Sequence, residues 1–312
     1  MNVLSLFDGM SCGQQALERA GIKVDNYFAS EIDKWAIQIA EKNYPKTIHL
    51  GDVTKVSKFW TDHKFPKIDL LIGGSPCQSF SNAGNGQAFN DPRGKLFFEY
   101  VKLWRLLKPK YFLLENVKMK KEHQDIITKY LGVEPIEINS SLVSAQNRKR
   151  IYWTNIPNVI QPIDKNILLK DILEDGIVNR DKSYCLDANY FKGGNLKMYF
   201  KKSRRQLVFK NNRCLQVGEA DIKGYDIIKR VYSKEGKAPS LTTMQGGHRE
   251  PKVYSGKNSW RKLTPLECER LQTVKDNYTA GVSNSQRYKM LGNGWTIDVI
   301  AHILKGLKEN KK

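Results

Sequence analysis

The sequence is poor in the residues that build metal sites and disulfide frameworks. It has five cysteines and five histidines in 312 residues, without a Cys-x-x-Cys pair and without a ligand-like spacing of the histidines. This scatter argues against both a disulfide framework and a zinc site, and we expect no bound metal. The cysteines are Cys12, Cys77, Cys185, Cys214 and Cys268.

Long apolar runs are also missing from the sequence. No run approaches the ~20 residues that a membrane-spanning helix needs, so we expect no membrane partner. The opening residues, MNVLSLFDGM, have neither a basic lead nor a cleavable signal pattern, which predicts a cytoplasmic protein. There is no internal repeat and no low-complexity tract. The apolar fraction of 40% suffices for one large domain or two smaller ones.

Acidic residues are too few to balance the basic ones. Lys and Arg outnumber Asp and Glu by 52 to 32, which gives a formal net charge of +20. Such an excess attracts polyanions at long range, and nucleic acid is the simplest of them. An anionic membrane surface is an alternative, but no basic amphipathic helix stands out. Charge alone also leaves open a protein that merely has solvated lysine faces.

The first part of the chain has the pattern of a nucleotide-binding α/β unit. Residues 2–6 read as a buried strand, and the turn FDGMSCG at residues 7–13 leads into a helix. The next predicted strand ends at Glu31, where a carboxylate suits a ribose diol. Asp52 closes a third segment, where it could accept a hydrogen bond from an exocyclic amine. The turn departs from G-x-G-x-x-G, so we expect no dinucleotide, and an ordinary βα turn with a solvent-facing Glu31 is the alternative.

A single thiol follows a strongly apolar stretch. Residues 68–72 read as a buried parallel strand, and Pro76 sets the backbone beside Cys77 at the strand's carboxyl end. Residues 78–94 are rich in Ser, Asn and Gly and form no obvious element. Open α/β sheets carry out chemistry at such a place. Taken alone, the Pro-Cys pair favours an inert buried cysteine, and the partners described next reverse this interpretation.

Two further stretches supply partners for this thiol. The segment YFLLENV reads as a buried strand with Glu115 and Asn116 at its carboxyl end, facing the same crevice as Cys77. A partly desolvated carboxyl group there is prepared to act as an acid, and a helix cap is the alternative. Arg148 and Arg150 would share one face of a strand and reach one anion or carbonyl. A solvated basic strand, or an arginine that only pairs with the glutamate, is the alternative.

Residues 155–258 have few long stretches with a periodic apolar pattern. This stretch has repeated Gly and Asn turns and basic clusters such as KKSRRQLVFKNNR. Its aromatic residues are interleaved with Lys and Arg, which predicts a small β-rich module that touches nucleic acid. A variable insertion with a solvated surface is the alternative. The aromatic residues in question are Tyr190, Phe191, Tyr199 and Phe200.

Regular structure returns near the C-terminal end. Thr264, Pro265 and Glu267 form a capping box with proline at the first helical position, which predicts a helix start. A second helix, a Gly-Asn-Gly turn at residues 292–294 and an amphipathic helix from about Thr296 should follow. A plain helix-to-helix loop is the alternative interpretation of the turn.

With these blocks in order, the chain closely resembles the DNA cytosine carbon-5 methyltransferases, including bacterial and phage modification enzymes. The resemblance covers residues 1–153 and 261–312. The FDG turn, in place of F-x-G-x-G-G, and ECERLQ with NYT are closer to the catalytic domain of the mammalian de novo enzymes. The Cys-Phe-Thr motif of the related tRNA-modifying branch is absent. The matching blocks are FDGMSCG, Glu31, Asp52, GGSPCQSFS, DPRGKLFF, LLENV, QNRKR, RKLTPLECERLQ and LGNGWTIDVI.

The resemblance implies an α/β fold, namely a Rossmann-like class I S-adenosylmethionine-dependent methyltransferase with an inserted small β-rich target-recognition domain. Residues 1–154 would form the catalytic and cofactor-binding domain and residues 155–260 the target-recognition domain. Residues 261–312 would pack back onto the catalytic domain. The resemblance also implies a monomer that acts on double-stranded DNA in the cytoplasm of a bacterium or a phage-infected host.

The resemblance further assigns catalytic roles. Cys77 would add to carbon 6 of a flipped-out cytosine, which activates carbon 5 toward the methyl group of S-adenosylmethionine. Glu115, with Asn116 beside it, would hydrogen-bond the ring nitrogen N3 and the exocyclic amine. Arg148 would hold the base carbonyl, and Arg150 would order the Cys77 loop or a phosphate.

S-adenosylmethionine is the implied cofactor, with S-adenosylhomocysteine as its product. Its expected contacts are Phe7, Asp8, Gly9, Gly13, Glu31, Ile32, Asp52, Val53, Pro76, Leu96, Asn293 and Gly294. The expected DNA contacts are Gln78, Ser79, Ser81, Arg93, Ser240, Thr242 and Gln245. Residues 78–94 would form a lid over the base, and turns near residues 192–195 and 242–249 would read the sequence. The segment PSLTTMQGGH resembles the family's recognition loop, with serine where threonine is usual.

Two other functions compete with this interpretation. The same fold could methylate cytosine in RNA, and an assay with tRNA beside DNA would separate the two. A catalytically dead relative could instead bind DNA or a protein partner. The presence of Cys77, Glu115 and Arg148 together argues against the dead relative.

Overall fold

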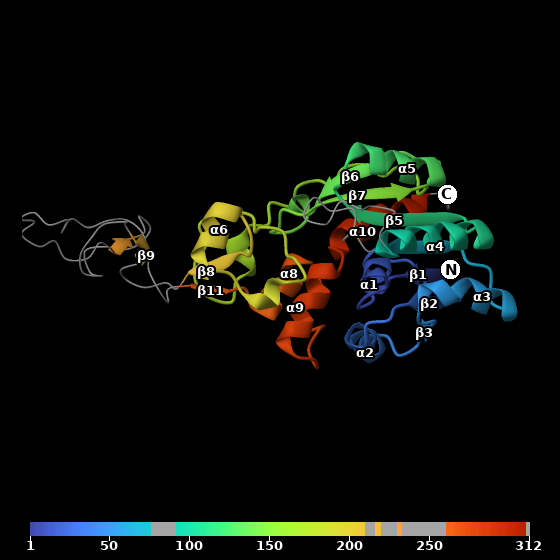
Figure 1. Cartoon of the computed structure of the whole chain (residues 1–312), viewed down its shortest axis with the longest axis horizontal. Coiled ribbons are helices and arrows are strands. Elements are labelled where there is room, and N and C mark those ends of the chain that lie inside the picture. The colour runs from blue at the N-terminus through green and yellow to red at the C-terminus, as the bar shows by residue number, and fades with distance from the viewer. Residues whose placement is uncertain (76–91, 210–215, 220–229, 233–259, 310–312) are drawn as a thin grey trace, which may run out of the picture.

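The computed structural model describes residues 1–75, 92–209, 216–219, 230–232 and 260–309. Figure 1 shows a layered α/β unit around one sheet, with the region of α6, β8 and β11 next to it along the long axis of the molecule. No helix in these residues is long and apolar enough to cross a membrane.

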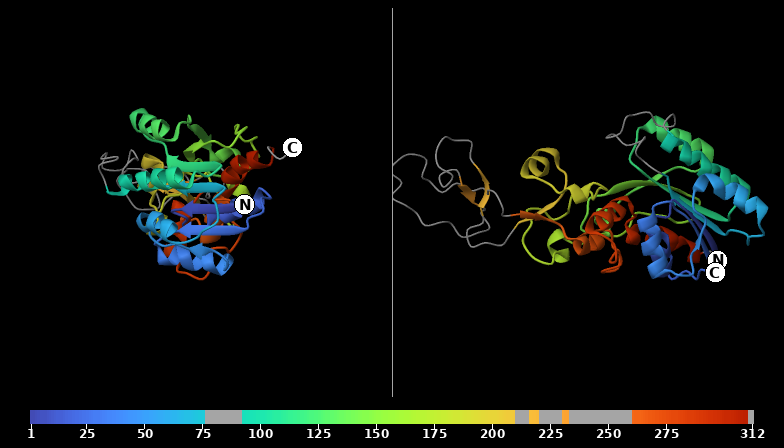
Figure 2. Two further views of the ribbon diagram at one scale, coloured as in Figure 1. Left: turned by 90° about the vertical axis from the view of Figure 1, so that its right-hand side faces the viewer. Right: turned by 60° about the horizontal axis from the view of Figure 1, so that its bottom comes forward.

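A seven-stranded sheet forms the centre of the α/β unit (Figure 1 and Figure 2). Its strand order is β3-β2-β1-β4-β5-β7-β6. The pairs from β3 to β5 are parallel, whereas β7 is antiparallel to both β5 and β6. The strands are β1 (Asn2–Leu6), β2 (Asn26–Ser30), β3 (Ile48–His49), β4 (Leu70–Gly74), β5 (Tyr111–Val117), β6 (Ile136–Asn139) and β7 (Lys149–Thr154).

Helices cover both faces of this sheet, which explains why its inner strands read as unbroken apolar runs. Successive residues of β1, such as Val3 and Leu4, belong to two separate buried clusters, one on each face. Helices α1 (Cys12–Arg19), α2 (Lys34–Asn43) and α10 (Ile297–Leu304) contribute to the first cluster. Helices α3 (Val53–Asp62), α4 (Pro92–Leu107) and α5 (Lys121–Leu131) contribute to the second.

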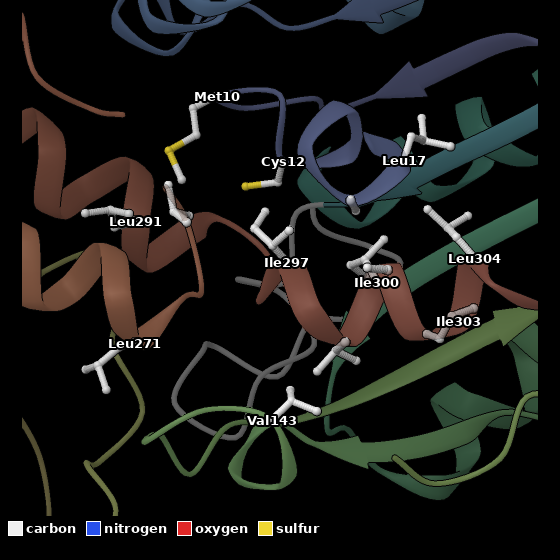
Figure 3. Packing of buried hydrophobic residues seen from close by; sticks show 14 of the residues in the cluster. Met10, Cys12, Leu17, Val143, Leu271, Leu291, Ile297, Ile300, Ile303 and Leu304 are labelled. Carbon is white, nitrogen blue, oxygen red and sulfur yellow. The ribbon is translucent and has the colours of Figure 1, made fainter. Parts of the chain in front are cut away.

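The last part of the chain packs against its beginning. Residues of α10, among them Ile297 and Leu304, share one buried cluster with Cys12 and Leu17 of α1 (Figure 3). The hydroxyl of Tyr278 also donates to the Met10 carbonyl over 2.7 Å. The core of the sheet is therefore complete only when the C-terminal helices are in place. The short α11 (Gly306–Glu309) follows α10.

Helix α8 (Pro265–Leu271) begins at the predicted capping box. Thr264 Oγ1 accepts from Glu267 N over 3.1 Å, Glu267 Oε2 accepts from Thr264 N over 2.8 Å, and Pro265 is the first helical residue. The next helix, α9 (Asn284–Asn293), continues through Asn293. The expected Gly-Asn-Gly turn therefore starts later than predicted, at the end of α9.

The described part of residues 155–260 contains short elements. Some of its residues, among them Leu169, Leu186 and Tyr190, join the main core, and others form a small core of their own. Tyr199, Leu207 and Phe209 form that core. Strand β8 pairs with β11 and β9 pairs with β10, both antiparallel. The elements are η2 (Ser140–Leu142) before this stretch, then the 3-10 helices η3 (Leu169–Ile172) and η4 (Tyr190–Lys192), helix α6 (Leu196–Lys202), and strands β8 (Leu207–Phe209), β9 (Gln216–Glu219), β10 (Arg230–Tyr232) and β11 (Trp260–Lys262).

Two of the four aromatic residues that are interleaved with Lys and Arg are buried in the core. Tyr190 is 1% exposed, and its hydroxyl lies between the Gln206 carbonyl, to which it donates, and Leu263 N, from which it accepts. Tyr199 is fully buried. Both rings are core residues, because a ring that alternates with lysines in the sequence can still point inward.

A buried carboxylate ties α8 to the segment that leads into α9 and to α9 itself. Glu269 has no exposed surface, and its oxygens accept from Asn277 N (2.7 Å), Thr279 N (2.8 Å), Thr279 Oγ1 and Arg287 Nη2 (3.0 Å). Arg287 is the cation of this group. A buried charge that keeps its cation is tolerated, whereas one that loses it is costly.

Replacing Arg287 by Met should therefore lower the free energy of unfolding by ~3–5 kcal/mol. Urea denaturation followed by circular dichroism measures this loss. Lys289→Met on the same helix is the matched control, since the ion pair of Lys289 with Asp33 (2.6 Å) is partly exposed and should be worth less than ~1 kcal/mol. Equal losses in the two variants would contradict the role given to the buried pair.

Candidate active site

The carboxyl ends of three neighbouring strands meet at one edge of the sheet. Leu6 of β1 is in register with Gly73 of β4, and Gly74 of β4 is in register with Glu115 of β5. The turn at residues 7–13 follows β1 directly. In open α/β sheets this edge is where ligands bind.

Glu115 is nearly buried, with 9% of its surface exposed. The Nε of Arg150, on the adjacent strand β7, lies 3.0 Å from Glu115 Oε1. The indole Nε1 of Trp295 donates to Glu115 Oε2 over 3.1 Å. Burial and the nearby Glu115 charge raise the pKa of the Tyr152 hydroxyl on β7. The carboxylate is thus held at each oxygen by a different donor, next to a neutral phenol.

Arg148 lies outside β7 and has a different environment. Its side chain is 3% exposed. Nη1 donates to Leu186 O (2.9 Å), and Nη2 donates to Gly292 O (3.2 Å) and Gly294 O (2.9 Å). A guanidinium whose terminal nitrogens are engaged by backbone carbonyls is not free to hold a base carbonyl. The expectation that both arginines reach one group is therefore wrong, because the first of them precedes the strand.

Asn116 links the end of β5 to the end of β4. It is 1% exposed, its Nδ2 donates to Ser75 Oγ over 3.1 Å, and its Oδ1 accepts from Val117 N over 2.8 Å. Several predicted site residues lie outside the described residues. They are Cys77, Pro76, Gln78, Ser79, Ser81, Ser240, Thr242 and Gln245, together with the side chain of Arg93.

The turn after β1 has the conformation of a rigid cradle. Phe7, Gly9 and Ser11 have φ angles of 58°, 59° and 60°, in the left-handed region that side chains disfavour. Glu31, after β2, fixes the turn through its Oε2, which accepts from Gly9 N over 2.8 Å. Its Oε1 accepts from Ile32 N over 2.8 Å. The ends of β1 and β2 are therefore joined into one surface.

Two of the residues expected to touch the cofactor instead pack inward. Asp8 is 8% exposed and accepts hydrogen bonds from Tyr27 Oη (2.7 Å) and Ser11 Oγ. A Cβ on Gly13 would lie 2.6 Å from both Ile72 Cδ1 and Tyr27 Oη. These contacts give Asp8 and Gly13 a structural role, which is to hold α1 against the sheet.

Other expected cofactor residues follow the ends of β2 and β3 or lie in α3 and α4. Asp52 Oδ1 caps α3 by accepting from Thr54 N over 2.9 Å, and this hydrogen bond lowers the pKa of the carboxyl group. The apolar Ile32 has 75% of its surface exposed. Val53 is buried, whereas Leu96 is partly buried.

The turn after α9 approaches the first turn of the chain. A Cβ on Gly294 would lie 3.2 Å from Cys12 Sγ and 3.0 Å from Met290 O, and Asn293 is exposed beside it. Within the described residues, no group of three or more His, Cys, Asp or Glu is arranged to hold a metal ion.

Sequence reasoning missed two side chains at this edge. Trp295 directly follows the Gly-Asn-Gly turn, and that position was the only available signal. Cys185 lies 3.4 Å from Arg148 Nη1. Cys185 is exposed, and although partial desolvation opposes its ionisation, the charges of Arg148 and Arg150 lower the pKa of its thiol. Nothing in the local sequence around Cys185 indicated this environment.

A family model described as C-5 cytosine-specific DNA methylase matches residues 1–309. The chain is 28% identical to the orphan methyltransferase M.Rho11sI of Bacillus phage rho11s, over 98% of the chain and 97% of the relative. It is 31% identical to the type II methyltransferase M1.ScrFI of Lactococcus lactis subsp. cremoris, over 93% of the chain and 75% of the relative.

A solved structure supports the fold. The methyltransferase EhMeth of Entamoeba histolytica superposes on the chain with a TM-score of 0.66 at 18% identity, and the match covers 100% of this chain and 99% of the other. The mostly parallel sheet and this likeness confirm the expected class I S-adenosylmethionine-dependent methyltransferase fold.

The buried carboxyl group of Asp8 should make the free energy of unfolding depend on pH. Burial raises the pKa of this carboxyl group, although the hydroxyls of Ser11 and Tyr27 oppose the shift. The folded state therefore binds more protons than the unfolded state, and stability falls as pH rises from about 4 through the raised pKa. Asp8→Asn cannot ionise, so its free energy of unfolding relative to the wild type should increase with pH over this window and then level off.

Urea unfolding of both proteins between about pH 2 and about pH 8, a range that spans the ordinary carboxyl pKa of about 4, measures this difference. Asp33→Asn is the opposite control. Burial opposes the shift, but Lys289 and the backbone of α2 hold the pKa of Asp33 below its ordinary value, so its stabilisation is lost as pH falls through that lowered pKa. A difference between Asp8→Asn and wild type that does not change with pH would overturn the prediction.

Proposed function

The chain belongs to the C-5 cytosine-specific DNA methylases and is therefore a DNA cytosine-5-methyltransferase, and we propose that Cys77, Glu115 and Arg150 act together on a flipped-out cytosine. The observation that carries this proposal is the placement of Glu115. Its buried carboxylate is held by Arg150 at the end of β5. It is in register with Gly74 at the end of β4, from which the chain continues toward Cys77.

Carbon 5 of cytosine is a poor nucleophile, so the ring has to be activated. The Cys77 thiolate forms a bond to carbon 6, and the displaced electron pair makes carbon 5 nucleophilic. Glu115 accepts a hydrogen bond from the exocyclic amine and, in its protonated form, gives a proton to N3 as negative charge develops there during this addition. After carbon 5 has gained the methyl group, it loses its proton, and the Cys77 thiolate leaves carbon 6. The aromatic ring and the free thiol are both restored.

Arg150 takes the role that the sequence had assigned to Arg148. Its side chain is 14% exposed, its Nε is paired with Glu115, and its Nη1 donates to the Lys149 carbonyl over 2.8 Å. Its pairing with Glu115 places it beside the base that the same carboxylate grips, where it holds the carbonyl oxygen. Arg148 is committed to backbone carbonyls. In this proposal Arg150 binds the base, and Arg148 holds the backbone of the surrounding structure.

S-adenosylmethionine is the proposed methyl donor, and the residues present fit it. Glu31 lies at the end of β2 for the ribose hydroxyls, and the exposed apolar Ile32 offers a surface for adenine. Asp52 lies at the start of α3 for the exocyclic amine, with Phe7 and Gly294 along the cradle. When bound, this molecule supplies an electrophilic methyl group on a sulfonium. No metal enters the proposal.

The target atom is inaccessible in a stacked duplex, so the cytosine has to swing out of double-stranded DNA at a cost of a few kcal/mol. Segments outside the described residues would close over it and read its neighbours. The charge of +20 suits such a partner. The proposed division is a catalytic domain (1–154), a recognition domain (155–260) and a returning segment (261–312), in a monomer. The proposed DNA contacts are Gln78, Ser79, Ser81, Arg93, Ser240, Thr242 and Gln245.

The covalent step predicts a trapped complex. Wild-type protein should label duplex DNA from tritiated S-adenosylmethionine, and DNA that contains 5-fluorocytosine should form an adduct that survives denaturing gels, because fluorine blocks the loss of a proton from carbon 5. Cys77→Ser should do neither. Cys268→Ala, which removes a thiol buried in α8, is the control and should still form the adduct. Adduct formation by Cys77→Ser would sink the assignment.

The division between the arginines predicts opposite effects. Arg150→Lys keeps the positive charge but loses the planar set of N–H donors of the guanidinium. The single-turnover rate of methyl transfer should therefore fall ~100-fold, while the free energy of unfolding changes little. Arg148→Lys leaves several backbone carbonyls without their hydrogen-bond donor and should lower the free energy of unfolding by about 1–3 kcal/mol. Urea denaturation and a single-turnover assay on both variants measure the split. An Arg148→Lys protein that is fully stable but defective in holding the base would restore the original assignment.

A further inference from the structure

The second oxygen of Glu115 has a partner from the far end of the chain. Trp295 lies in the turn between α9 and α10, and its indole Nε1 donates to Glu115 Oε2 over 3.1 Å. The contact is partly buried. A charge-assisted hydrogen bond of this kind fixes the direction of the acceptor as well as its distance. Arg150 binds the other oxygen, so the two donors together set the plane of the carboxylate.

The end of β4 provides the room for this contact. A Cβ on Gly74 would lie 2.8 Å from Glu115 Oε2 and 3.0 Å from Trp295 Nε1. Even the smallest side chain at position 74 would therefore have to push one of these groups away. Glycine at the last residue of β4 is required by a close approach of two side chains, not by its backbone angles.

The turn that carries Trp295 is itself held in place by side chains. Arg148 Nη2 donates to Gly294 O over 2.9 Å, and Gln272 Nε2 donates to Leu291 O over 2.7 Å and to Gly294 O over 3.2 Å. Gln272 has no exposed surface. A continuous series of contacts therefore leads from Arg148, through this turn, to the carboxylate of Glu115.

We propose that Trp295 is a positioning residue, whose indole N–H holds Glu115 in the orientation that meets the base, with Gly74 providing the space and Arg148 fixing the turn. Both arginines of the QNRKR segment then act on Glu115. Arg150 does so directly, and Arg148 acts through the backbone of residue 294. The inference rests on the proposed function, since it assumes that Glu115 touches cytosine. It adds a residue for which no role was predicted from the sequence.

The contact can be observed without catalysis by NMR of the indole N–H groups. The chain has six tryptophans, and Trp295→Phe identifies the resonance of Trp295. In the cofactor-free protein this resonance should shift when Glu115→Gln removes the charge of its acceptor. The indole of Trp153 donates to the hydroxyl of Thr128 over 3.0 Å and is the internal control, because its acceptor carries no charge.

Gly74→Ala should move the Trp295 resonance in the same direction as Glu115→Gln, because the added methyl group separates the two partners. A Trp295 resonance that is unchanged in both variants would overturn the proposal. Circular dichroism of each variant confirms that the fold is retained.

The kinetic test compares Trp295→Phe, which keeps an aromatic ring but loses the donor. The single-turnover rate should fall about 10- to 100-fold, as expected for a slightly misplaced catalytic group, while KM for S-adenosylmethionine stays within about twofold. In the Glu115→Gln background the same substitution should have no further effect. If KM for the cofactor carries the whole loss, Trp295 is a wall of the cofactor site and the proposal fails.

Different results would overturn the role of Glu115 and the role of Trp295. Full activity of Glu115→Gln would overturn the proposed function of Glu115 itself. An inactive Glu115→Gln protein beside a fully active Trp295→Phe protein would overturn only the role of Trp295.

Discussion

The packing of α10 against α1 is the constraint on which this structure depends. Both helices bury apolar residues in the cluster on one face of the sheet, and Ile297 and Leu304 have no exposed surface. Because the hydrophobic contribution scales with the apolar area removed from water, this helix pair is a substantial part of the core. The same contact carries the turn at Gly294 and Trp295 to the edge where β4 and β5 end. Stability and the completion of the site therefore have one cause.

The site is built from two parts of the chain that lie far apart in the sequence. Strand β1 leads into the turn at residues 7–13, β4 ends with Gly74, and β5 carries Glu115. These parts alone would leave this edge of the sheet open. The turn after α9 closes this edge from the opposite side, since it meets both Cys12 and Glu115. The stretch between β7 and β11 takes part in this arrangement, because Leu169, Ile172 and Leu186 belong to the same buried cluster as α1 and α10.

Much of this arrangement could be predicted from the sequence, but only where the signal is local. The bounds of β1 and β5 match the predicted segments, and the capping box at Thr264 lies where its spacing placed it. Arg148 could not be placed, because period-two alternation holds only inside a strand and β7 begins one residue later. Trp295 could not be placed either, since its partner is 180 residues away. Tyr199 was misread because basic neighbours hide an inward-facing ring.

Three buried glutamates show how the fold separates structural from reactive carboxylates. A carboxylate has about four lone-pair sites. Glu269 accepts from four donors, and Glu267 accepts from Glu174 N, Thr264 N and two nitrogens of Arg261. Both are saturated, as buried charges must be if they are to be inert.

Glu115 differs from these two in its free capacity. In the described part of the chain it accepts from Arg150 and Trp295, one donor at each oxygen. A carboxylate that is held in direction but not saturated can still accept from the exocyclic amine of a base, and from its ring nitrogen once that nitrogen is protonated. An unsatisfied buried acceptor costs free energy in the empty protein, and a ligand that satisfies it recovers this cost. The same incompleteness that would be a defect in Glu267 is therefore what allows Glu115 to bind a base.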